Sequence, residues 1–143
     1  KYLLKQLKEI KAGTRPVVEM TGLLDGFNDQ DLADISAFFA KQKVVVGQTP
    51  EDQVEAGQLL YRTGIAAKGV AACTACHSPT GAGVASAGFP ALGGQHSAYI
   101  EAQLKKFRSG ERANDPGNMM RDIAGKMSDA DIKAVSAYVQ GLY

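Results

Sequence analysis

The chain has 143 residues, of which 22% are charged, and its formal net charge is +1. A chain of this length forms one domain or two small ones. The balanced charge argues against nucleic acid as a partner, because nucleic-acid binding is driven by a large positive surface charge. No apolar stretch is long enough to cross a bilayer, so we expect no transmembrane segment.

The first third of the chain repeats the last third. Pairs 97 positions apart include Tyr2/Tyr99, Gln6/Gln103, Gly13/Gly110 and Arg15/Arg112. After a three-residue difference in length, Met20 falls on Met120, and a spacing of 100 then holds through Phe39/Val139. We interpret the chain as one and a half copies of one unit. Residues 1–43 are the C-terminal part of a first domain, 44–50 a linker, and 51–143 a complete domain.

The expected elements are helices, and no strand pattern is present. The sequence predicts a capping box at Asn28, and then an N-cap at Thr49 that begins a helix over Glu51–Thr63. A Gly-rich loop is expected over Gly81–Gly94, followed by a helix over Tyr99–Phe107 that ends near Gly110. A second capping box at Ser128 begins the last predicted helix, Asp129–Gln140. Val54, Gly57, Leu60 and Tyr61 share one face of the first of these helices. The sequence therefore predicts an all-α fold.

The two cysteines of the chain stand in the motif Cys73-Thr74-Ala75-Cys76-His77. This CxxCH spacing is that of c-type haem attachment, in which two thiols bond the haem vinyl groups and the histidine binds the iron. A thioredoxin-like redox pair would need a preceding strand, and the Gly- and Ala-rich flanks supply none. A structural zinc would need four Cys or His ligands, and His96 is the one other histidine. Haem c is therefore the expected cofactor, with one attachment site here.

A low-spin electron carrier needs a second axial ligand. Of the candidates, Met119 aligns with Glu19 and Met127 with Phe27, whereas Met120 alone aligns with a methionine. We therefore expect Met120 to be the ligand, and ligation by two histidines through His96 is the alternative. Ordinary packing in the core is the other role open to Met120. By the same logic Met20 is either the axial ligand of a first-domain haem, whose CxxCH is absent here, or a core methionine.

The motifs from Gly57–Tyr61 through Cys73–His77, the segment Phe89–Gln95 and the Met120 loop resemble a class I cytochrome c. The tandem arrangement resembles the two-domain, two-haem cytochromes c4 over essentially the whole chain. The resemblance implies the class I cytochrome c fold and a second haem in the complete protein. It also implies that the carbonyl of Pro90 accepts a hydrogen bond from His77. The loop over 15–20 is shorter than the family pattern.

The resemblance implies an electron carrier rather than an enzyme. It would shuttle single electrons in the bacterial periplasm from a bc-type complex to a terminal oxidase, with loose attachment to the inner membrane. Thioether formation takes place outside the cytoplasm, so the missing signal peptide at Lys1 suggests a mature or trimmed chain. The alternatives are a haem c module serving a periplasmic dehydrogenase or reductase, an enzyme or gas sensor with an open iron position, and a CxxC disulfide reductase.

Basic residues recur on both copies, and their function is open. Partner steering at an exposed haem edge and simple solvation of helix faces are equally compatible with the pattern. The residues concerned are Lys5, Lys8, Lys11 and Arg15 on the first copy, and Lys105, Lys106, Arg108 and Arg112 on the second.

Overall fold

The computed structural model describes residues 1–143 and is helical, as predicted. Its α-helices are α1 (Tyr2–Lys11), α2 (Asp29–Ala40), α3 (Glu51–Thr63), α4 (Thr74–His77), α5 (Ser97–Ser109), α6 (Met119–Ala124) and α7 (Asp129–Gln140). Short 3₁₀ helices cover Val18–Met20, Ala66–Lys68 and Pro116–Asn118. The β structure consists of two isolated bridges, Ile65 to Val70 and Val84 to Phe89. No helix is long and apolar enough to span a membrane.

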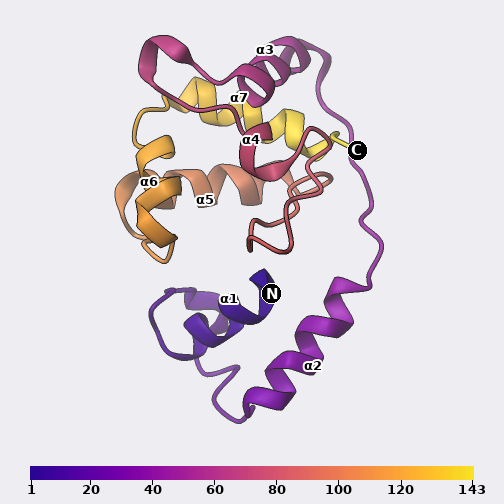
Figure 1. The fold of residues 1–143 in the computed structure, drawn as a ribbon, viewed down its shortest axis with the longest axis vertical. Coiled ribbons are helices and arrows are strands. Elements are labelled where there is room, and N and C mark those ends of the chain that lie inside the picture. Colours follow the sequence, from indigo (N-terminus) through magenta and orange to yellow (C-terminus); the bar gives the residue numbers. More distant parts are fainter.

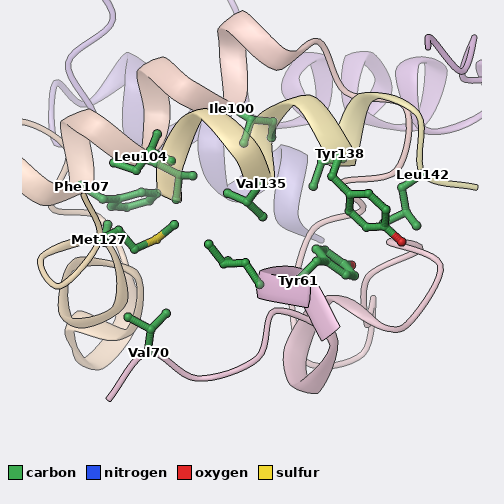
Figure 2. Packing of buried hydrophobic residues seen from close by; sticks show 13 residues of the cluster. Tyr61, Val70, Ile100, Leu104, Phe107, Met127, Val135, Tyr138 and Leu142 are labelled. Atoms are coloured by element: carbon green, nitrogen blue, oxygen red, sulfur yellow. The ribbon is translucent and has the colours of Figure 1, made fainter. Parts of the chain in front are cut away.

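The main core lies among α3, α5, α6 and α7 (Figure 1). Tyr61, Ile132 and Val139 are among its least exposed side chains, each at 1% or less. Figure 2 shows Tyr61 and Tyr138 near one end of this cluster and Phe107 and Met127 near the other. Met127, which aligns with Phe27, is 5% exposed and belongs to this core.

Helices α3 and α7 approach each other closely at Gly57. A Cβ atom there would lie 2.5 Å from the carbonyl oxygen of Ala134 and 2.5 Å from Cβ of Tyr138. Glycine therefore allows the two backbones to meet. Gly57, Leu60 and Tyr61 face inward as expected, but Val54 is 39% exposed, because it lies one turn before the crossing with α7.

Local sequence signals place most helix ends. Asn28 and Ser128 each form a complete capping box, in which the cap side chain accepts the N3 backbone N–H and the N3 aspartate accepts the cap backbone N–H. Gly110 ends α5 in the left-handed region at φ +79°. The expected Thr49 cap is wrong: Pro50 precedes α3, and the Thr49 hydroxyl instead donates to the carbonyl of Ala137 at 3.1 Å.

Residues 1–43 form a smaller unit in which α1 packs against α2 around Leu7, Leu24 and Leu32. It lies apart from α3 and α7 and beside α5 in Figure 1. The linker, residues 44–50, lies against the C-terminal end of α7. There the N–H of Gly47 donates to the carbonyl of Gln140 at 3.0 Å, and the Gln140 amide donates to the carbonyl of Gln48.

Candidate functional site

The CxxCH motif forms the short helix α4 at the edge of the main core. Cys73 directly precedes this helix and packs against the core, and both cysteines are half-buried free thiols. Burial raises the pKa of the Cys73 thiol to about 11, so the thiol is protonated at neutral pH. A disulfide reductase needs the opposite, a depressed thiol pKa. No group of three or more metal-binding side chains gathers in the structure.

His77 is buried and oriented by one hydrogen bond. Its Nδ1 atom lies 2.9 Å from the carbonyl oxygen of Pro90, which leaves Nε2 available to a metal. Burial lowers the pKa of His77, and the contact with Pro90 offsets this only in part. The imidazole is therefore neutral at neutral pH, as an iron ligand must be.

A loop holds the Pro90 carbonyl in place. The bridge between Val84 and Phe89 closes the turn before Pro90, and the N–H of Gly83 donates to the carbonyl of His77 at 2.9 Å. Gly83 has φ +72°, and a Cβ there would lie 2.5 Å from the carbonyl carbon of Pro90. The loop therefore fits only with glycine at position 83.

The surroundings of His77 fit haem. Five apolar side chains pack against the main core while remaining partly exposed: Ile65, Cys73, Leu92, Met120 and Ile123. Two thiols one helical turn apart and one buried neutral imidazole are the donor set that a covalently attached haem requires, and the partly exposed apolar side chains would contact its ring.

Met120 lies in the first turn of α6 and is half-buried against the main core. Its segment is fixed by Asp115, whose carboxylate accepts the backbone N–H of Arg121 at 3.0 Å and the Arg121 Nε–H at 2.7 Å. Burial alone would raise the pKa of Asp115, but the two hydrogen bonds from Arg121 outweigh it and hold that pKa below its usual range. Nothing in the sequence singled out this anchor.

The other candidate ligands lie in different surroundings. Met119 is 41% exposed, and His96 is exposed just before α5. Met20 ends the 3₁₀ helix Val18–Met20 and packs against the smaller core of residues 1–43, as Met120 packs against the larger one.

Two of the recurring basic residues are not on a solvated or partner-facing surface, as both sequence interpretations had them. Arg15 and Arg112 are each 6% exposed, because they turn into the contact between residues 1–43 and the larger unit. The repeated Tyr, Gln and Arg of the two copies were the signal for this contact: identical polar residues recur at one spacing. Lys5 instead forms an ion pair with Glu9, one turn later on α1, and Lys105 with Glu101, one turn earlier on α5.

Comparison with known proteins agrees with this geometry. The cytochrome c family model matches residues 54–143. A cytochrome c4 from Pseudomonas aeruginosa is 54% identical over all of this chain and 72% of its own length. The crystal structure of reduced recombinant cytochrome c4 from Pseudomonas stutzeri superimposes with a TM-score of 0.97 at 49% identity, covering 99% of this chain and 80% of that one. A thiosulfate dehydrogenase electron acceptor from Stutzerimonas stutzeri is 34% identical over 96% of this chain and 64% of its own length.

The helical fold and the CxxCH site define a cytochrome c that carries covalent haem c, which confirms the expected fold class and cofactor. Its function is electron transfer, and it is a carrier rather than an enzyme. Within that class, the chain belongs to the cytochrome c4 family.

Proposed function

We propose that the chain carries single electrons through a haem bonded to Cys73 and Cys76, with His77 and Met120 on the iron. The observation that carries this proposal is the hydrogen bond between His77 and Pro90, which fixes Nδ1 and leaves Nε2 for the metal. Met120 is supported as the second ligand because it is half-buried against the same core. Met127 is 5% exposed within the core, and Met119 and His96 are exposed.

The haem supplies a one-electron couple between Fe(III) and Fe(II). His77 and Met120 would hold the iron, and Cys73 and Cys76 would hold the haem. The thioether of Met120 is a soft ligand that favours Fe(II). The carbonyl of Pro90 increases electron donation by His77 and so favours Fe(III). With His77 and Met120 both holding the iron, the haem would supply outer-sphere electron transfer and would bind no substrate.

The rate of carbon monoxide binding tests whether the haem iron has a free coordination position. Reduced protein should bind carbon monoxide slowly, because Met120 must first leave the iron. Met120→Ala should bind it rapidly and should have a lower reduction potential, whereas the matched variant Met119→Ala should behave like the wild type. Rapid binding by the wild-type protein would show an open iron position and would favour an enzyme or gas sensor.

Residues 1–43 are, we infer, the C-terminal part of a first cytochrome c domain, and 51–143 a complete one. Phe38 and Phe39 on α2 are 62% and 58% exposed. Their counterparts on α7, Tyr138 and Val139, are 8% and 1% exposed in the core that α3 completes. The exposed face of α2 therefore fits a helix equivalent to α3 from the same domain. Met20 would then ligate the haem of that first domain. A mass spectrum of the intact full-length protein that shows two covalent haems would support this organisation.

For partners, we propose transfer from a bc-type complex to a terminal oxidase in the bacterial periplasm, with loose attachment to the inner membrane. The alternative is service to a periplasmic dehydrogenase, which the similarity to a thiosulfate dehydrogenase electron acceptor favours. Stopped-flow reduction of the oxidised protein separates the two. The first proposal expects fast reduction by a quinol-reduced bc-type complex. Fast reduction only by thiosulfate with its dehydrogenase would favour the second.

A further inference from the structure

The contact between residues 1–43 and the larger unit has an approximate two-fold arrangement. The Arg15 guanidinium donates to Gln6 on its own unit at 2.8 Å and to the hydroxyl of Tyr99 across the contact at 2.9 Å. Its repeat partner does the same in reverse: Arg112 donates to Gln103 at 2.8 Å and to the hydroxyl of Tyr2 at 2.9 Å. Two buried cations therefore lie in one contact.

One side of this contact is filled by Asn114. Its side-chain amide donates to Gln6 at 2.9 Å and to Glu9 at 2.6 Å, and its backbone carbonyl accepts a hydrogen bond from Lys5 at 2.8 Å. This side therefore holds a carboxylate and a lysine, and its polar groups are paired with one another.

The other side lacks this filling. The first copy has three fewer residues between its arginine and its methionine, and Ala102 and Lys106 stand where the first copy has Lys5 and Glu9. A cavity of about 260 Å³ lies there, and its lining includes Arg15, Val17, Tyr99, Gln103, Lys106 and Arg112. On this side the ammonium group of Lys106 therefore stands at the position equivalent to the carboxylate of Glu9, and a cavity lies beside it.

The charge in this cavity is unbalanced. Three cationic side chains line it, and Glu19 is the one carboxylate. Neither Arg15 nor Arg112 forms an ion pair, and Lys106 pairs with Glu111 at 2.8 Å. Arg15 is 6% exposed, and its Nε–H has no hydrogen-bond partner. A buried cation with an unused donor is costly unless an anion accepts from it.

We propose that this cavity binds an oxyanion, a carboxylate or a phosphate, through Arg15, Arg112 and Lys106. Guanidinium groups form their strongest hydrogen bonds with these two kinds of group. The carboxylate can come from a haem propionate or from an anion in solution. Binding of a free anion does not depend on the proposed iron ligands or redox partners. Binding of a haem propionate depends only on the presence of covalent haem.

Titration of the haem-loaded protein with inorganic phosphate, in chloride buffer, tests the site by calorimetry. Arg15→Gln and Lys106→Gln remove cavity donors, and Lys133→Gln on the exposed face of α7 is the matched control. Lys106→Gln leaves the contact hydrogen bonds of Arg15 intact, so it remains informative if Arg15→Gln does not fold. The reduction potential of each variant is measured in parallel.

A free anion predicts saturable phosphate binding that weakens about tenfold in each cavity variant and is unchanged in the control. A haem propionate predicts no phosphate binding. In that case loss of either cation lowers the reduction potential, because a nearby positive charge disfavours Fe(III). The proposal is overturned if phosphate does not bind and both cavity variants have the potential of the control. All of these variants retain Met120 and each is compared with the Lys133→Gln control, so failure here is distinguishable from failure of the proposed ligation.

Discussion

His77 and Pro90 are joined by a 2.9 Å contact between the imidazole Nδ1 atom and the proline carbonyl oxygen. This contact has two consequences. It fixes the tautomer, because Nδ1 must carry the proton in order to donate. It also makes the imidazole a stronger donor to iron. The geometry of a loop thirteen residues away therefore sets the properties of the ligand.

Gly83→Ala should break this contact. The new Cβ would lie 2.5 Å from the carbonyl carbon of Pro90 and would push that carbonyl away from His77. We expect the reduction potential to rise, because a weaker imidazole donor stabilises Fe(III) less. Gly88→Ala is the matched control: Gly88 also has a positive φ, at +81°, but nothing lies within 4 Å of its added Cβ. Equal potentials for the two variants, measured by voltammetry, would contradict this account.

Asp115→Asn should loosen the segment that carries Met120. The carboxylate accepts two hydrogen bonds from Arg121, and the neutral amide replaces both poorly, at a cost of about 2 kcal/mol in the free energy of unfolding. The pKa of Asp115 is depressed in the folded protein. Its contribution is therefore complete above the unfolded pKa, near 3.9, and is lost as the pH falls through the folded pKa.

Denaturant unfolding at pH 7 and pH 3 measures this effect. The difference between wild type and Asp115→Asn should be large at pH 7 and should shrink at pH 3. Asp122→Asn, an exposed change in the same segment, should be near neutral at both values. A difference that persists unchanged at pH 3 would show that the carboxylate charge is not what anchors the segment.

Gly57→Ala should destabilise the fold through the crossing of α3 and α7. A methyl group at this position overlaps the carbonyl of Ala134 and Cβ of Tyr138, and overpacking of this kind costs about 1–3 kcal/mol. Gly26→Ala adds the same methyl group where nothing lies within 4 Å, so it should change the midpoint of thermal unfolding little. If the two variants unfold at the same temperature, the close approach at Gly57 is not a determinant of stability.

Local chemistry allowed much of this fold to be predicted from sequence. The capping boxes at Asn28 and Ser128 place the starts of α2 and α7, and the internal repeat distinguishes Met120 from Met119 and Met127. Long-range contacts were not predictable in the same way. Arg15 and Arg112 have the spacing of exposed basic residues, and only the meeting of two units buries them. Asp115 likewise becomes an anchor only once the turn brings Arg121 back to it.

The central claim is that His77 and Met120 fill both axial positions of a covalently held haem. The absorption spectrum of the oxidised protein tests it most directly, because sulfur ligation of Fe(III) by methionine gives a weak charge-transfer band at the red end of the spectrum. We predict that this band is present in the wild type and in Met119→Ala and is absent in Met120→Ala. A wild-type protein without the band, or a Met120→Ala variant that retains it, would contradict the account.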